Sequence, residues 1–232
     1  MPRNNLQNSE LLRVDRSALG WTAGVYGIYA GILGGEHGFF EALQGNTATA
    51  HLRIFAVSWE LPFPFGHEPA MTLIPNFLAT GIAAMLCSVV MIIWSTRFIR
   101  GERGGVVLAL LSVVLLLVGG GFGPISLLMV ACIAASRIGK PLRMSRGLIP
   151  PVLCHALARL WPWVFVASLV WVPAEFAAGQ IFHLHNDHRQ ILTNLNLLLT
   201  YPMLGLFALG LVSAIARGIE GQNSGRVSSG AT

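Results

Sequence analysis

Long apolar stretches alternate with short charged segments along the chain. The stretches that match one membrane crossing, which takes about 20 apolar residues, lie at about 18–33, 74–99, 161–181 and 194–216. The first pattern can continue as a helix to Leu43, and the second has Pro75 at its start. Together they predict an all-α protein, a polytopic bundle of transmembrane helices.

The apolar stretch 105–136 is longer than one crossing needs, and it is interrupted by the glycine-rich segment Gly119 to Pro124. Such a segment does not continue a helix, and basic residues flank both ends of the stretch. We therefore expect a short hairpin with its glycine turn at the tip, either two short crossings or a re-entrant pair of half-helices. Counted as a hairpin, it brings the number of crossings to six.

Two segments outside these runs have their own character. Residues 148–159 have apolar and polar positions at helical spacing, which predicts an amphipathic helix leading into the next crossing. Residues 217–232 are rich in Gly and Ser, so a disordered cytoplasmic tail is expected. The remaining residues 1–216 form one transmembrane domain.

The composition excludes a soluble globular protein, because 54% of the residues are hydrophobic, only 11% are charged, and the mean hydropathy is +0.65. Cys87, Cys132 and Cys154 each stand alone in an apolar stretch, which fits buried thiols better than disulfides or CxxC metal sites. The first apolar run is long enough to cross and lacks a small-residue cleavage pattern. It is therefore interpreted as an uncleaved helix rather than a signal peptide.

The distribution of charge predicts the orientation. With six crossings, 13 of the 15 Lys and Arg residues fall on the side of the termini, and only Arg53 and Arg189 fall opposite. Positive charge collects on the cytoplasmic side of membrane proteins. The expected location is the bacterial inner membrane with both termini cytoplasmic, and the net charge of +5 then reflects topology rather than nucleic-acid binding.

Glycines recur at helical spacing along the first helix. They are Gly20, Gly24, Gly27, Gly31, Gly34, Gly35 and Gly38. Spacings of this kind let a neighbouring helix approach to backbone contact. The neighbour can belong to the same chain or to another subunit, so a homo-oligomer or a membrane-complex partner is possible.

Histidine is concentrated on the predicted extracytoplasmic side. Six of the seven histidines lie there: His37, His51, His67, His183, His185 and His188. Carboxylates accumulate on the same side, namely Glu36, Glu41, Glu60, Glu68 and Asp187. Neutral imidazole with carboxylate is a ligand set for a divalent transition metal.

The metal ligands predicted from these groups are His37, Glu41, His67, His183, His185 and His188. The residues predicted to support them by accepting imidazole N–H groups are Glu36, Glu68, Glu175 and Asp187. His37 and Glu41 are four residues apart and share a helix face, although they could also cap a helix end in solvent. The histidines after 182 could instead lie in the lipid headgroup zone. Copper, zinc and iron all suit such ligands, and bis-histidine haem remains open.

Glu175 is an ionisable residue inside a predicted crossing, about 20 Å along its helix and beside Pro173. A carboxyl group at that depth usually faces a partner, a cavity or a pathway. Candidate partners are His37 and the histidines after 182, and the alternative is backbone freed by Pro173.

Three sequence strings carry a resemblance. Glu36-His37-Gly38-Phe39-Phe40-Glu41-Ala42-Leu43-Gln44-Gly45-Asn46, His67 to Thr72 with Pro75-Asn76-Phe77, and Gly119 to Pro124 resemble a group of bacterial multi-pass membrane proteins with no known activity. The similarity covers roughly the first 135 residues. It carries over no activity and does not extend to the segment 183–188.

Three functions follow as hypotheses. The leading one is an integral membrane metalloprotein with an extracytoplasmic His and carboxylate site, for metal handling or metal-dependent redox chemistry. The second is a transporter that uses the broken segment near Gly119 and the intramembrane Glu175. The third is a non-catalytic subunit or assembly factor. The sequence does not decide whether the protein is an enzyme, and no GxSxG nucleophile motif occurs.

Overall fold

The computed structural model describes residues 18–56, 69–142, 150–185 and 189–230. Its helices are α2 (Ala18–Leu43), α3 (Phe77–Arg97), α4 (Gly104–Leu117), α5 (Phe122–Arg137), α7 (Pro151–His185) and α8 (Arg189–Gly230). Two short strands, β1 (Arg53–Phe55) and β2 (Pro69–Met71), pair antiparallel. The all-helical architecture expected from the sequence is therefore confirmed, as is the continuation of the first helix to Leu43.

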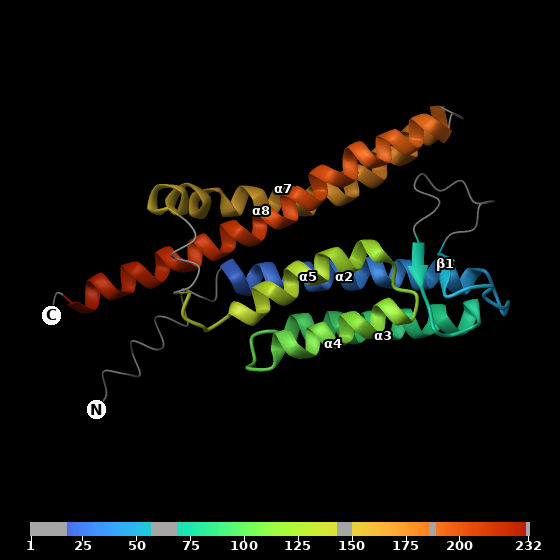
Figure 1. Cartoon of the computed structure of the whole chain (residues 1–232), viewed down its shortest axis with the longest axis horizontal. Coiled ribbons are helices and arrows are strands. Elements are labelled where there is room, and N and C mark those ends of the chain that lie inside the picture. Colours follow the sequence, from blue (N-terminus) through green and yellow to red (C-terminus); the bar gives the residue numbers. More distant parts are fainter. Residues whose placement is uncertain (1–17, 57–68, 143–149, 186–188, 231–232) are drawn as a thin grey trace.

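Consecutive helices run in alternating directions, and both described ends of the chain lie at one end of the molecule (Figure 1). Among the residues that the structure describes, three helical segments are long and apolar enough to cross a membrane: Phe77–Arg97, Pro151–Glu175 and Leu198–Asn223. Helices α4 and α5 have 14 and 16 residues and form the expected hairpin. At 1.5 Å per residue they span only about 21 and 24 Å.

The glycine stripe of α2 packs against α3 of the same chain. A Cβ atom at Gly38 would lie 2.7 Å from the Gly81 carbonyl oxygen, and one at Gly31 would lie 3.2 Å from the Ser88 carbonyl oxygen. Any side chain there would force the two helices apart. The predicted close packing is confirmed, and its partner is intramolecular at these positions. A contact of α2 with another subunit is thereby restricted to faces that α3 does not cover.

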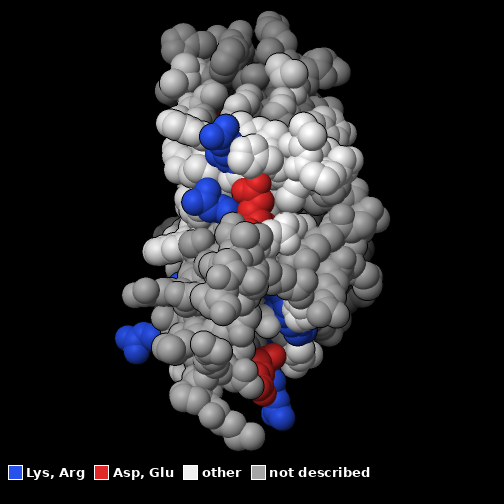
Figure 2. Space-filling model, turned by 90° about the vertical axis from the view of Figure 1, so that its left-hand side faces the viewer, with Lys and Arg blue, Asp and Glu red and all other residues white. Residues whose placement is uncertain are grey.

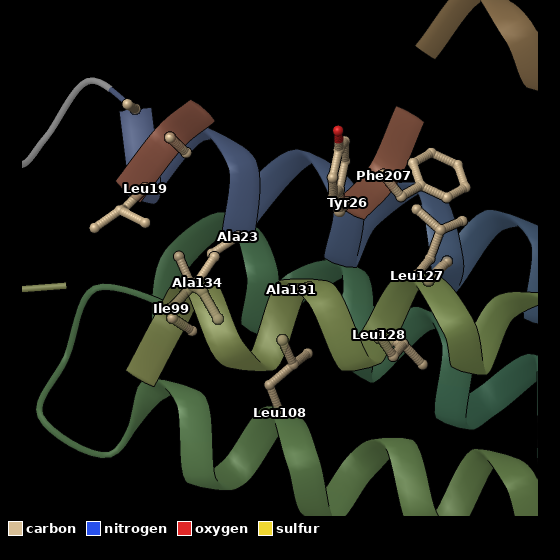
Figure 3. Close-up of a cluster of buried hydrophobic side chains, with 14 of the residues drawn as sticks. Leu19, Ala23, Tyr26, Ile99, Leu108, Leu127, Leu128, Ala131, Ala134 and Phe207 are labelled. Atoms are coloured by element: carbon tan, nitrogen blue, oxygen red, sulfur yellow. The ribbon is translucent and has the colours of Figure 1, made fainter. Parts of the chain in front are cut away.

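Small and branched side chains fill the space between the helices. In Figure 3, Leu127, Ala131 and Ala134 of α5 lie between α2 and α4, which contributes Leu108. Tyr26 of α2 is fully buried, and its hydroxyl is hydrogen-bonded to Ser168 Oγ of α7 at 2.8 Å. This contact joins the four-helix unit of α2 to α5 to the long hairpin of α7 and α8.

The outward faces of the helices are apolar. Exposed side chains include Leu86, Val90 and Ile93 of α3, Val106, Leu110 and Val113 of α4, and Trp163, Val166 and Val170 of α7. Exposed apolar residues on several neighbouring helices form a larger apolar surface than a soluble monomer usually has. They are the surface expected of helices that face lipid tails.

The two long helices extend beyond the expected boundaries. Helix α7 is continuous through Pro162 and Pro173, so the amphipathic segment and the following crossing form one helix. Each proline removes one backbone hydrogen bond. Membrane helices tolerate this loss because neighbouring groups can satisfy the freed backbone carbonyl. Helix α8 continues through most of the segment for which the sequence predicts a disordered tail, to Gly230. Gln222 helps to hold this part, because its side chain bonds to Lys140 O and Leu142 N.

Basic side chains gather at the end of the molecule that carries the chain termini. Arg97, Arg100, Arg103, Arg137 and Lys140 occupy the ends of α3, α4 and α5 there, and Figure 2 shows basic side chains on this end. Arg53 of β1 lies at the opposite end (Figure 1). The described residues thus have the one-sided charge that the sequence predicts for six passes.

Candidate functional site

His37 and Glu41 lie one turn apart on α2, and both are buried. His37 is 6% exposed and Glu41 is 0% exposed. They do not cap a helix end in solvent, because the α4–α5 hairpin tip covers this part of α2. The spacing that suggested a shared helix face therefore places an imidazole and a carboxyl group together inside the protein.

The turn between α4 and α5 lies directly on these two side chains. A Cβ atom at Gly119 would lie 2.5 Å from Glu41 Oε1, and a Cβ atom at Gly121 would lie 2.6 Å from both ring nitrogens of His37. Both glycines also have positive φ angles, +97° and +78°, which residues with a side chain rarely adopt. Only glycine satisfies the backbone conformation and the close approach together.

Backbone hydrogen bonds hold the turn in this place. Gly119 N donates to Met71 O of β2 at 2.9 Å, and Gly120 N donates to Leu115 O at 2.8 Å. The hydroxyl of Thr80 on α3 donates to Val118 O at 2.8 Å. Hydrogen bonds from strand β2, helix α3 and the end of α4 therefore fix the position of the glycine turn over α2.

The strand pair is itself tied to the end of α2. Gln44, just after the helix, donates through Nε2 to Phe55 O at 3.1 Å and to Ala56 O at 2.8 Å. The segment from β1 to β2 thus begins and ends beside the candidate site. Residues 57–68, between the two strands, lie outside the described chain.

Glu41 is the unusual group of the site. Neither of its carboxyl oxygens has a hydrogen-bond partner among the residues that the structure describes. A charged carboxylate in such a place is costly unless a cation or donors surround it. Glu41 therefore has to hold a proton or lie next to a cation, and the nearby His37 ring supplies a second ligand atom of a type that transition metals prefer.

The other predicted ligands are not brought to this pair within the described chain. His67, Glu68, Asp187 and His188 lie outside the described residues, and His183 and His185 belong to the last turn of α7, where side chains are not described. The tip of the α7–α8 hairpin lies at the same end of the molecule as β1 but stands away from it (Figure 1). Over the described ranges, no three His, Cys, Asp or Glu side chains form a group that could hold a metal.

Glu175 has a partner that the sequence reasoning missed. Thr200 of α8 donates its hydroxyl to Glu175 Oε1 at 2.9 Å, and Glu175 is half-buried. The two residues belong to antiparallel neighbouring helices, so helix pairing brings them together. The role of Gly119 and Gly121 was also missed. The sequence shows the Gly-rich turn and the pair of His37 and Glu41 separately, and only the fold brings them together.

The described chain is a helical bundle that contains helices long and apolar enough to span a membrane. No protein-family model, curated protein or solved structure matches the chain.

Proposed function

We propose that the protein is an integral membrane protein that binds a transition-metal cation at a site containing His37 and Glu41. The observation that carries this proposal is the complete burial of Glu41, with both carboxyl oxygens lacking a hydrogen-bond partner in the described structure. A bound cation would compensate this carboxylate, and the imidazole one helical turn away would share its coordination.

The remaining ligands come from the other histidine groups in this proposal. His67 precedes Met71 by four residues in the sequence, and Met71 O accepts the hydrogen bond from Gly119 N at the site. The chain therefore leads from His67 directly to the glycine turn. His183, His185 and His188 are the further candidates, with Glu36, Glu68, Glu175 and Asp187 as acceptors for imidazole N–H groups.

The site lies on the extracytoplasmic side in the topology that we propose. Six crossings and cytoplasmic termini are supported by the alternating helix directions and by the basic residues at the end of the termini. Glu41 is near the end of α2 that lies away from that basic end. If the protein lies in a bacterial inner membrane, the site faces the periplasm, from which it would bind copper, zinc or iron.

Elemental analysis tests the proposal on the full chain, purified in detergent and loaded with Cu²⁺, Zn²⁺ or Fe²⁺. Glu41→Gln keeps the size and removes the charge, and His37→Gln removes the imidazole. Matched controls are His51→Gln and His155→Gln, because both histidines are exposed and outside the site. We expect wild type and controls to retain one metal and both site variants to lose it. Wild-type protein that retains no metal after loading contradicts the proposal.

A second candidate function is cation-coupled transport, favoured by a separate observation. Glu175 lies at the end of a candidate membrane span and is hydrogen-bonded to Thr200 in another span. Together with Glu41 it gives two carboxyl groups in the helical bundle. Proteoliposomes that move metal or protons, with loss of flux in Glu41→Gln and Glu175→Gln, would support transport over static binding.

A further inference from the structure

A cavity between α2 and α7 lies on a different face of α2 from His37 and Glu41. It has a volume of about 320 Å³ and is lined by Tyr29, Ile32, Leu33 and Glu36 of α2 and by Val172 and Pro173 of α7. The four α2 residues recur at helical spacing and form one face of the helix. This α2–α7 cavity is therefore built by two packed helices rather than by a loop.

The lining is apolar apart from one carboxylate. Tyr29 adds little polarity, because its hydroxyl donates to Leu169 O at 3.0 Å. Glu36 is thus the one ionisable acid among the lining residues. It also has an interaction within the protein, but a carboxylate offers about four acceptor positions, so a ligand can add to that interaction.

We propose that the α2–α7 cavity binds a lipophilic organic amine in its protonated form. The ammonium group would contact the Glu36 carboxylate, and an aryl or alkyl body would fill the space beside Ile32, Leu33 and Val172. Apolar surroundings strengthen the attraction between opposite charges. A neutral hydrocarbon tail would leave the carboxylate without a ligand group, and a bare metal ion would leave the apolar walls without contact.

The size of the cavity sets the size of the ligand. Dividing 320 Å³ by about 30 Å³, the share of one water molecule in the liquid, gives room for about ten non-hydrogen atoms. 4-Phenylbutylamine has this size and is charged at neutral pH. 4-Phenylbutanol has the same shape without the charge. The pair therefore isolates the contribution of the charge, and the comparison is made on protein without added metal.

Calorimetric titration of the full chain in detergent, with protein-free micelles as the blank, tests this inference. We expect saturable binding of 4-phenylbutylamine and binding of 4-phenylbutanol that is about tenfold or more weaker, as for one hydrogen bond to a charged group. The Glu36→Gln variant should bind the two compounds alike. The control Glu102→Gln changes an exposed carboxylate in the turn between α3 and α4 and should bind like wild type.

A second variant checks the place of binding. Leu33→Phe adds bulk to the wall of the cavity and should weaken both compounds. Equal binding of the amine and the alcohol by wild type overturns the proposal, as does the absence of saturable amine binding. This comparison uses the unmodified protein, so it decides the question even if a variant fails to fold. Tighter binding of the alcohol than of the amine would identify a site for neutral lipids and would also overturn it.

Discussion

Replacing Gly121 with alanine tests whether the glycine turn presses on the candidate site. Gly121 has φ +78° and ψ 157°, a backbone conformation that costs a residue with a side chain about 1–3 kcal/mol. The new methyl group would overlap the His37 ring, and overpacking of this kind costs about 1–3 kcal/mol more. The expected loss in the free energy of unfolding is therefore about 2–6 kcal/mol.

A matched glycine separates the two contributions. Gly139 also has a positive φ, +70°, but a Cβ atom there would have no heavy atom within 4 Å. Gly139→Ala should cost only the conformational share, about 1–2 kcal/mol. The free energies can be measured by titrating purified protein in mixed micelles from a mild detergent into SDS.

A double-mutant cycle with His37→Ala then isolates the contact. Removing the ring should relieve the overlap, so Gly121→Ala should cost about 1–3 kcal/mol less in the His37→Ala background. The backbone cost is the same in both backgrounds and cancels. A coupling below about 0.5 kcal/mol, the range of independent sites, would refute the contact between the turn and His37.

Three further outcomes are expected. Tyr26→Phe keeps the ring packing and loses the hydrogen bond to Ser168, so the free energy of unfolding should fall by about 1 kcal/mol; a fall above about 3 kcal/mol would point to lost packing instead. Thr200→Val should destabilise by about 1–3 kcal/mol because it removes the hydroxyl that bonds to Glu175, whereas Glu175→Gln retains an acceptor and should change stability less; equal effects would contradict this reasoning. In a cysteine-free background, Phe122→Cys at the hairpin tip should react with a membrane-impermeant thiol reagent from the periplasmic side only, and labelling from the cytoplasmic side only would reverse the topology.

The sequence was sufficient for the features that depend on local pattern. The glycine spacing of α2 predicted close packing on a neighbour, and the structure identifies α3 as that neighbour. The split at Gly119 to Pro124 predicted the hairpin of α4 and α5. In both cases the relevant signal lies within one helix or one turn, where helical periodicity and backbone conformation are directly readable.

The burial of the candidate site depended on contacts that are distant in the sequence. Glu41 and Gly119 are far apart along the chain, and their contact requires the hairpin, strand β2 and helix α3 to meet at one place. The periodicity of α2 alone predicted that His37 and Glu41 share a helix face. It did not predict whether this face is buried or exposed to solvent. The Glu175–Thr200 bond likewise depends on the register of α7 against α8, which an apolar pattern does not determine.

Amino-acid composition alone did not predict how far helix α8 extends. Gly and Ser in the segment after Ala216 favour disorder when the segment is considered alone. In the structure Ile219 is buried and Gln222 bonds to the chain that follows α5. Tertiary contacts of this kind outweigh weak helix propensity, and they involve residues that are about 80 positions away.

X-ray absorption spectroscopy of the zinc-loaded full chain is the most direct test of the metal site. We expect a shell of nitrogen and oxygen ligands at about 2.0–2.1 Å from zinc, with the additional scattering of imidazole rings. The imidazole contribution should decrease in His37→Gln, and zinc should be lost or its oxygen ligation changed in Glu41→Gln, while His155→Gln matches wild type. Bound zinc with an identical spectrum in wild type, His37→Gln and Glu41→Gln would contradict the assignment of the site to these two residues.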